Sequence, residues 1–394
     1  MAWCLNPEAN VSRQTRPVRL GFSLLFFFVL LAGSGCRTAA LDSARSNFYQ
    51  GRVREAAEEL SAIEPAERDR VLFLMERGTI RQALGEREDS TRDFVEAADL
   101  LGDLETYSLS GGATSLVIND SVQPFRGAPY ERTLLHGMTA LNHLADGRWD
   151  LAAVEARRIL RTLDPDHLGN YPEDAFSRYV AGFAFEMTDD PSNAALQYRL
   201  ADERATEPPL GERERPTRNS PDPDASSEWV IFLLSGEGPD AGNVRFSSGF
   251  GEALRVDVVQ GDRILGQGRK LADTRDLARE TDRVDALWKT AKTATRFVIK
   301  EILAEAAAQS AESDAVGDLV RLVLFGLFEE QAPRRWITLP GSFWVARVPC
   351  SPEEGNLTLV IHGSAGRAPR VLPVPATSAR RRSTRVSVIR DLPN

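Results

Sequence analysis

Two stretches decide the fold: "FYQGRVREAAEEL" at residues 48–60 and "RQALGEREDSTRDFVEAADLL" at residues 81–101. In each, a glycine separates two runs in which apolar residues recur every three or four positions, and Gly51 and Gly85 are 34 residues apart. Such spacing predicts amphipathic helices, and glycine suits the turn that joins two of them. Further turns of this kind are expected at Gly147 and around Asp189. The first half of the chain is therefore predicted to consist of successive helical hairpins.

The period of 34 residues is also the length of a tetratricopeptide repeat, in which small and large residues pack at fixed offsets from the turn. Small residues hold their positions in every copy, whereas large residues hold theirs in only some copies. The residues assigned to repeat packing are Gly78, Phe94, Ala97, Ala140, Ala152, Gly182, Phe185, Ala194 and Tyr198. We predict a tetratricopeptide-like array over residues 36–204, whose concave groove would bind a protein segment. The alternative is an ordinary antiparallel array of helices with coincidental spacing.

An insertion interrupts this array, because the distance from Gly85 to Gly147 is 28 residues longer than one repeat. The extra residues, 103–131, contain "GG", "ND" and "RGAP", which are typical of turns. Long loops inside compact domains are often functional. The insertion is thus expected either to close the groove or to be a solvated spacer.

The second half has a different pattern. Residues 205–227 combine prolines and charges with almost no apolar residues, which predicts a flexible linker. Residues 228–394 mix strand patterns with a helical block, which indicates an α+β domain with a basic C-terminal tail. Strands are expected in "EWVIFLLS" at 228–235, "EALRVDVVQGDRIL" at 252–265, "RRWITLPGSFWVARVP" at 334–349 and "NLTLVIHG" at 356–363, and helices over 271–309 and 318–330. The tail, "RRRSTRVSVIRDL" at 380–392, either contacts an acidic partner or is a solvated edge strand protected by its arginines.

The N-terminus has the features of an export signal. Three arginines precede an uncharged run from Leu20 to Ala32, and small residues follow it. A membrane-spanning helix needs about 20 apolar residues, so this run is too short to cross a bilayer. Residues 1–35 are therefore predicted to be a signal peptide.

The sequence "LAGSGC" at residues 31–36 resembles a bacterial lipobox. In such a motif the cysteine, here Cys36, receives fatty-acyl groups such as palmitate, and this lipid anchors the mature chain to a membrane. Gly33 departs from the usual leucine, so ordinary secretory cleavage and an uncleaved anchor remain alternatives. Arg37 stands where an aspartate retains enterobacterial lipoproteins in the inner membrane. By this resemblance the protein is expected on the outer membrane, facing the periplasm.

The net charge limits the classes of partner that the protein is expected to bind. The net charge is −9, and phosphate contacts supply most nucleic-acid affinity, so no nucleic-acid partner is expected. The chain has three cysteines. Cys350 would remain alone in the mature chain, so no disulfide framework is expected.

The order of features resembles a family of uncharacterised bacterial outer-membrane lipoproteins with tetratricopeptide-like N-terminal repeats. The stretches behind this resemblance are "LVINDSVQPFRGAPYERTLLHGMTALNHL" at 116–144, "EDAFSRYVAGFAFE" at 173–186 and the "RRWITLPGSFWVARVP" stretch, with Trp336, Leu339 and Pro340. The resemblance implies architecture and location and points to no particular activity. We take five residues of its insertion motif as candidate partner-binding residues: Asn119, Asp120, Arg126, Tyr130 and Glu131.

The sequence motifs that would indicate a catalytic site are incomplete in this chain. "GEGPDAG" at 236–242 lacks the helix that a dinucleotide fingerprint needs, and His136 and His143 are seven residues apart, unlike the zinc pair of metalloproteases. "HGSAG" at 362–366 lacks the glycine that flanks a nucleophile elbow. We therefore expect no enzyme, no metal and no cofactor.

The leading functional hypothesis is a periplasm-facing scaffold that binds a protein partner, as yet unidentified, through the repeat groove. The alternative is a regulator of peptidoglycan synthesis or envelope assembly that contacts a penicillin-binding protein or the cell wall, by analogy with other repeat-containing lipoproteins. A third hypothesis is a lipid-facing transport or assembly factor.

Overall fold

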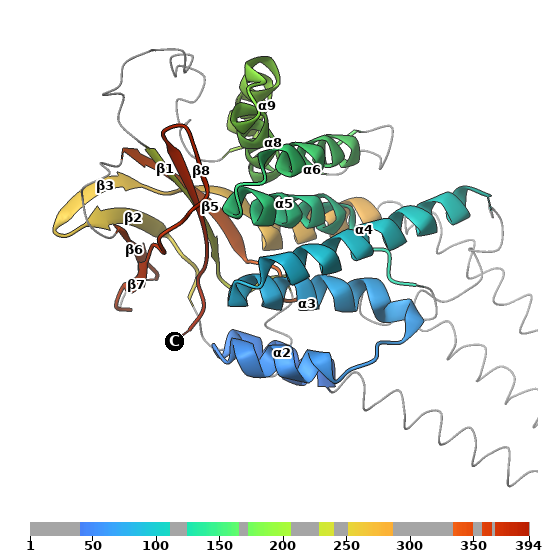
Figure 1. Cartoon of the computed structure of the whole chain (residues 1–394). Coiled ribbons are helices and arrows are strands. Elements are labelled where there is room, and N and C mark those ends of the chain that lie inside the picture. The colour runs from blue at the N-terminus through green and yellow to red at the C-terminus, as the bar shows by residue number, and fades with distance from the viewer. Residues whose placement is uncertain are drawn as a thin grey trace, which may run out of the picture.

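The computed structural model describes residues 40–110, 124–164, 172–205, 228–239, 251–286, 334–349, 357–364 and 367–393, with main chain only at 105–110. Helices occupy the first part of this chain, and two β-sheets occupy the second part (Figure 1). The predicted class, a helical first part followed by an α+β part, is therefore confirmed. The finer assignment to tetratricopeptide repeats stays a prediction.

The helices of the first part pack as successive pairs. A helix over residues 40–49 is followed by α2 (Val53–Ser61), the 3-10 helix η1 (Glu67–Asp69), α3 (Arg70–Leu84), α4 (Arg87–Ser110), α5 (Pro129–Ala145), α6 (Trp149–Thr162), α8 (Ala175–Met187) and α9 (Pro191–Arg204). The pairs α3–α4, α5–α6 and α8–α9 each pack closely along their length (Figure 1). Each pair is a helical hairpin.

The turn positions expected from the sequence lie at the tips of these pairs. Gly51, Gly85 and Gly147 have φ angles of 79°, 83° and 71°, and Asp189 has a φ of 63°. This left-handed conformation ends a helix, and glycine adopts it without steric cost. Aspartate is one of the few other residues that tolerate it. The pattern therefore identified the residues at which the chain reverses direction.

The residues assigned to repeat packing are all buried. A Cβ atom at Gly78 would come within 2.5 Å of the Phe94 ring, and a Cβ atom at Gly182 would come within 3.0 Å of the Tyr198 ring. In both hairpins, the small residue of one helix thus faces the large residue of its partner. This contact is what lets the two helices approach closely.

The second part contains two sheets. One has the order β4-β5-β1-β9-β8, with β1 (Glu228–Ser235), β4 (Arg269–Asp273), β5 (Ser342–Pro349), β8 (Arg380–Arg381) and β9 (Thr384–Arg390). The other has the order β3-β2-β6-β7, with β2 (Arg255–Gln260), β3 (Arg263–Gln267), β6 (Leu357–His362) and β7 (Arg370–Pro373). Strand β1 pairs antiparallel with β5 and parallel with β9.

The five-stranded sheet is buried on both faces. Along β1, Phe232 and its alternate neighbours belong to a core shared with the helices, whereas Ile231 and its alternate neighbours belong to a core between the two sheets. We call these the helix–sheet core and the sheet–sheet core. The described part thus has three layers: helices, five-stranded sheet and four-stranded sheet (Figure 1).

The helix–sheet core crosses the predicted domain boundary at 205–227. The rings of Phe176 on α8 and Phe343 on β5 stack with centroids 4.0 Å apart, and Tyr179 and Phe183 lie edge-on to Phe232 of β1. Helices and sheet therefore share one interior. Residues 206–227 lie outside the described residues, so the flexible linker stays a prediction.

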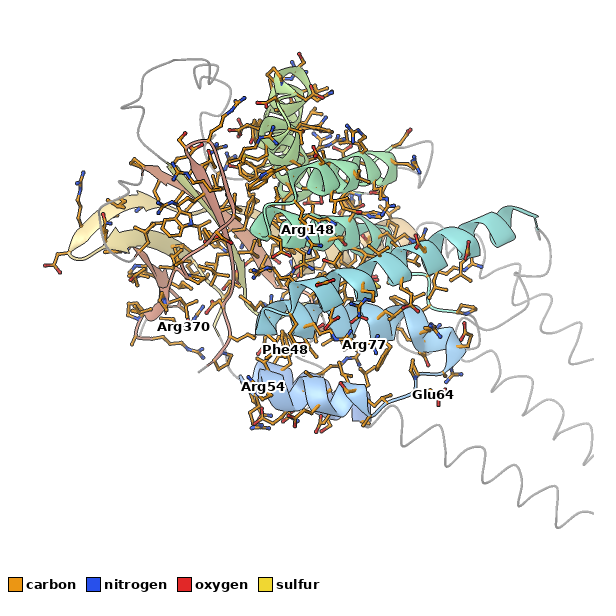
Figure 2. All side chains as sticks on the ribbon, in the orientation of Figure 1. Phe48, Arg54, Glu64, Arg77, Arg148 and Arg370 are labelled. Atoms are coloured by element: carbon orange, nitrogen blue, oxygen red, sulfur yellow. The ribbon has the colours of Figure 1, made fainter. Side chains whose placement is uncertain are left out.

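A third core joins the first helical pair to the end of the chain. Phe48 lies between α2 and α3 (Figure 2), and Leu392 packs against the same cluster. A Cβ atom at Gly51 would come within 2.1 Å of the Pro393 carbonyl oxygen. The last residues of the chain therefore close over the first pair.

Some expectations about elements need correction. Residues 103–110 continue α4 and residues 129–131 begin α5, so the described ends of the insertion are helical. No proline lies between the start of α4 at Arg87 and Pro124, which lets α4 continue. Residues 271–273 belong to strand β4, and the described helix that follows is residues 274–286. In the 334–349 stretch, only Ser342–Pro349 is a strand, because the backbone N–H groups of 336–338 bind side chains instead.

The edge-strand interpretation of the basic tail is right for β8, which carries Arg380 and Arg381 at the edge of the five-stranded sheet, and wrong for β9. Strand β9 lies inside this sheet, between β1 and β8. Its residues Val386 and Ile389 face opposite cores and are buried, which is the pattern of a two-sided strand. The expected helix at 318–330, His167 and Cys350 lie outside the described residues.

Candidate functional site

The most elaborate polar site lies where the end of the insertion meets residues 334–341. Residues 124–128 leave the insertion without regular secondary structure, and Phe125 is buried, with its N–H donating to the Arg68 carbonyl oxygen at 2.7 Å. Helix α5 begins at Pro129, where a missing N–H costs nothing. The Ala128 N–H donates to the Glu131 carboxylate at 2.6 Å, which fixes that side chain at the start of the helix.

Two buried carboxylates hold the backbone of the 334–341 segment. Glu131 accepts the N–H of Trp336 at 2.8 Å. Glu76 of α3 accepts the N–H of Ile337 at 2.9 Å and of Thr338 at 3.0 Å. Both glutamates are fully buried. Consecutive N–H groups at a turn of this segment are thus satisfied by side chains rather than by a neighbouring strand.

Arginines balance these carboxylates. Arg45 donates from Nε at 3.0 Å and from Nη2 at 2.7 Å to one oxygen of Glu76. Burial raises the pKa of Glu131 to about 7, although the two backbone N–H bonds and the charge of Arg335 oppose that rise. Arg335 itself donates to Asp282 at 2.5 Å. Glu131 therefore titrates near neutral pH inside the protein.

Two aromatic residues, Trp336 and Tyr49, form the buried part of the site. Trp336 is fully buried, lies edge-on to Phe94 with centroids 5.8 Å apart, and donates from Nε1 to Thr79 at 3.0 Å. The Tyr49 hydroxyl donates to the Ile337 carbonyl oxygen and accepts the N–H of Gly238 at 3.0 Å. Burial raises the pKa of Tyr49, so this hydroxyl stays protonated. These bonds join the first helical pair to the sheet.

An arginine cluster, made of Arg68, Arg126, Arg132 and Arg334, lies at the rim of the site. Arg132 donates from Nε to the Arg126 carbonyl oxygen at 2.8 Å. Arg334 donates to the Arg68 carbonyl oxygen at 3.2 Å, and its guanidinium lies 5.9 Å from the centroid of the Phe125 ring. The cluster therefore collects cations from η1, the insertion exit, α5 and the 334–341 segment.

The structure separates the predicted partner-binding residues. Cys36, Asn119 and Asp120 lie outside the described residues. Arg126 is half-buried at the rim, whereas Tyr130 and Glu131 are buried. Tyr130 faces Arg335, which approaches its hydroxyl at 3.4 Å. Intramolecular contacts thus occupy Tyr130 and Glu131, and binding of another protein to this motif stays a prediction.

The sequence reasoning missed Glu76, Arg45 and Thr79. A signal for Glu76 was present, because it is an acid inside the apolar stretch "VLFLMERGTI" of α3. A charge at a core position of a helix needs a partner. Nothing in the sequence identified that partner as a backbone segment more than 250 residues away; the pairs are 261 and 262 positions apart.

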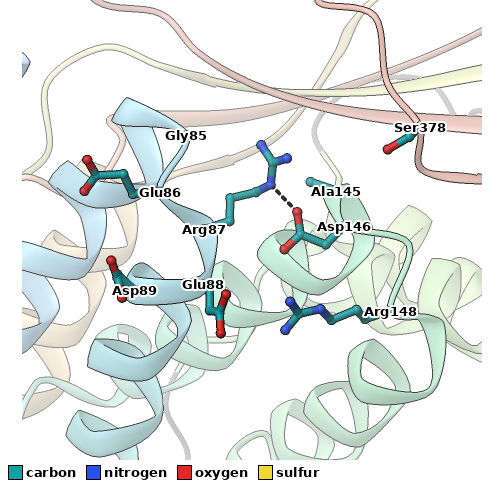
Figure 3. A pocket seen from close by; sticks show the side chains of 9 residues that line it. All are labelled: Gly85, Glu86, Arg87, Glu88, Asp89, Ala145, Asp146, Arg148 and Ser378. Carbon is teal, nitrogen blue, oxygen red and sulfur yellow. Dashed lines mark hydrogen bonds and ion pairs between the residues drawn. The ribbon is translucent and has the colours of Figure 1, made fainter.

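A separate hollow of about 450 Å³ lies between the α3–α4 and α5–α6 turns (Figure 3). Charged residues of both signs line it, and Arg87 spans it to pair with Asp146 at 2.5 Å. Arg148 and Glu88 also point toward it, and Ser378 comes from the sheet side. The hollow is shallow and polar, unlike the enclosed apolar cavities that hold small molecules.

His136 and His143 of α5 lie in structural environments. His136 lies 2.8 Å from Glu155, and His143 is buried, which lowers its pKa. Among the side chains that the structure describes, no group of three or more His, Cys, Asp or Glu could hold a metal ion. Within the same ranges, no helix has the length and apolar character to cross a membrane.

Comparison of the chain with protein-family models, with curated proteins and with solved structures finds no match. The resemblance to the outer-membrane lipoprotein family therefore stays a prediction from the sequence motifs.

Proposed function

We propose that this protein is a non-catalytic scaffold that binds a protein partner at the periplasmic face of the outer membrane, to which a lipid on Cys36 anchors it. One observation carries the proposal: the helices hold a peptide segment by its backbone. Glu76 and Glu131 accept the N–H groups of residues 336–338, which enter a turn. Contacts to the main chain are a common way in which proteins bind peptide segments.

Residues 336–338 of the chain itself occupy the surface that Glu76 and Glu131 form. A second protein is therefore expected to bind beside it, on the rim where Pro124 is exposed and Arg126 is half-buried. The buried interior would keep this rim rigid, because Glu131 fixes the start of α5 and Phe125 anchors the exit of the insertion. A rigid rim binds without paying the entropy of ordering a loop.

Cross-linking in cells from a photo-reactive residue placed at Pro124 tests whether a protein partner binds at the rim. We expect one or a few discrete cross-linked proteins, and none from the same residue placed at Arg54, which is exposed on α2 outside the rim (Figure 2). Identical cross-linked species from both positions, or none from Pro124, would argue against a partner at the rim.

Radiolabelled palmitate tests the anchor separately. The wild-type chain is expected to incorporate the label and Cys36→Ala is expected to lose it, together with its membrane association. An unlabelled wild-type chain would remove the lipid anchor from the proposal, while the cross-linking result would still decide whether a partner exists.

A further inference from the structure

The arginine cluster is a positive site in an acidic protein, whose net charge is −9. Its members are linked by hydrogen bonds from arginine side chains to the carbonyl oxygens of other members. Among the described residues, the Asp69 carboxylate pairs with the cluster, with Arg68 at 3.3 Å and with Arg334 at 2.5 Å. Four cations against this one carboxylate leave the cluster with a net positive charge.

Arg126 differs from the other three arginines. Arg68, Arg132 and Arg334 have further partners. Within the part of the chain that the structure describes, the guanidinium of Arg126 has no hydrogen bond or ion pair, and its Nε atom is buried. A buried donor without an acceptor costs about 1–3 kcal/mol. An acceptor brought by a ligand would recover that free energy.

We infer that the arginine cluster binds a phosphate group through Arg126. A guanidinium presents parallel N–H donors that match two oxygens of a phosphate, and such charge-assisted pairs are about twice as strong as neutral ones. Inorganic phosphate can carry two negative charges, so the neighbouring arginines favour it over a monocarboxylate. The group would belong either to free inorganic phosphate or to a lipid headgroup. This inference depends neither on the lipid anchor nor on the protein partner.

Calorimetric titration of the purified full-length chain with inorganic phosphate and with glycerophosphoglycerol, the soluble headgroup of phosphatidylglycerol, tests the inference. We expect Arg126→Gln to weaken binding of the preferred probe at least tenfold. Arg92→Gln is the matched control, because Arg92 lies exposed on α4 and pairs with Asp89. Arg126→Lys keeps the charge but loses the planar fork, so an intermediate affinity is expected.

The preferred probe identifies the source of the phosphate group. Tighter binding of the diester indicates a lipid headgroup, and tighter binding of inorganic phosphate indicates the free ion. Succinate that binds as tightly as the better phosphate probe would overturn the inference in favour of a carboxylate site. Failure of both phosphate probes to bind, or equal binding to wild type and Arg126→Gln, would overturn it altogether.

A thermal readout separates loss of binding from loss of folding. A ligand that binds only the folded state raises its melting temperature. The preferred probe is therefore expected to raise the melting temperature of the wild type and of Arg92→Gln at matched ionic strength, and to leave that of Arg126→Gln unchanged. An equal rise in Arg126→Gln would contradict a role for Arg126.

Discussion

The helix–sheet core and the sheet–sheet core differ in their balance of apolar and charged contacts. The sheet–sheet core is made mainly by apolar side chains such as Ile231, Val258 and Leu359, and the pair of Arg370 on β7 with Asp391 after β9, at 2.6 Å, links the two sheets. The helix–sheet core adds buried ion pairs, among them Arg347 with Glu186 and Glu228, each at 2.9 Å. Arg269 and Asp202 form another pair at 2.7 Å.

The two kinds of contact differ in how much free energy of unfolding a substitution is expected to cost. Apolar burial is non-directional, so a core tolerates small changes of shape at modest cost. A buried charge tolerates no loss of its partner, because desolvation has already removed the water that would replace it. The helix–sheet core thus resembles an interface between two proteins, although one chain forms both sides. Single substitutions should therefore cost more there than in the sheet–sheet core.

The largest effect is expected from Glu76→Ala. This change removes one of the two carboxylates that pair with buried Arg45, the other being the half-exposed Asp42, and takes away the acceptor of the Ile337 and Thr338 N–H groups. We expect a loss of roughly 4 kcal/mol in the free energy of unfolding, measured with urea. Glu58→Ala on the exposed face of α2 is the control and should change little. A loss no greater than that of the control would mean that Glu76 does not hold the segment.

Glu131 gives the next effect, which depends on pH. Its pKa in the folded state is about 7, above the usual value of 4.5, so the folded state binds more protons than the unfolded state between these values. The free energy of unfolding therefore falls as pH rises from about 4.5 to about 7, by on the order of 3 kcal/mol, since one pKa unit corresponds to about 1.4 kcal/mol. Urea unfolding at pH 5 and pH 8 measures it.

Glu131→Gln is the control for this pH dependence. The variant cannot titrate at this position, so this part of the slope between pH 5 and pH 8 should disappear. Its stability at any single pH also changes, because an amide cannot accept both backbone N–H groups equally. A slope identical to that of the wild type would assign the titration to another group.

Arg269→Met is expected to cost roughly 2 to 3 kcal/mol, because it leaves the Asp202 carboxylate nearly buried without this cation. Both residues have other interactions, which limits the loss. The double change Arg269→Met with Asp202→Leu should recover most of it, since apolar replacements of a buried pair are often neutral. A double variant as unstable as the single one would show that the pair's geometry, and not its charge, matters.

The smallest effect is expected from Ile231→Val in the sheet–sheet core. Removing one buried methylene costs about 0.5–1.5 kcal/mol. Ile264→Val is the matched control, because Ile264 is 59% exposed on the outer sheet and should change stability little. If Ile231→Val costs as much as Arg269→Met, the proposed contrast between the two cores is wrong.

Local features of the fold could be predicted from the sequence. The turns at Gly85 and Asp189 follow from where helical periodicity stops, because few residues adopt a left-handed conformation. Strand β1 follows from its short apolar run bounded by glycine. Each of these signals lies within a few residues of the element that it predicts.

Long-range features could not be predicted in the same way. The basic residues of β9 suggested an exposed edge, but its place in the sheet depends on a parallel pairing with β1, which no local pattern encodes. Likewise, the motif residues Tyr130 and Glu131 looked like a surface for a partner. Their actual neighbours, Arg335 and Trp336, are 205 positions away. Only the three-dimensional structure brings such pairs together.

The position of β9 also constrains how the protein is made. This inner strand is synthesised long after β1, and Ser235 and Asp391, which bond at 2.6 Å, are 156 residues apart. Contacts so distant in sequence slow folding, because a long loop must close before they form. The five-stranded sheet and the cover of the first helical pair can therefore be completed only after β9 and Leu392 have been synthesised. Until then the growing chain exposes the edge of β1 that β9 later covers, and a chaperone could bind this edge.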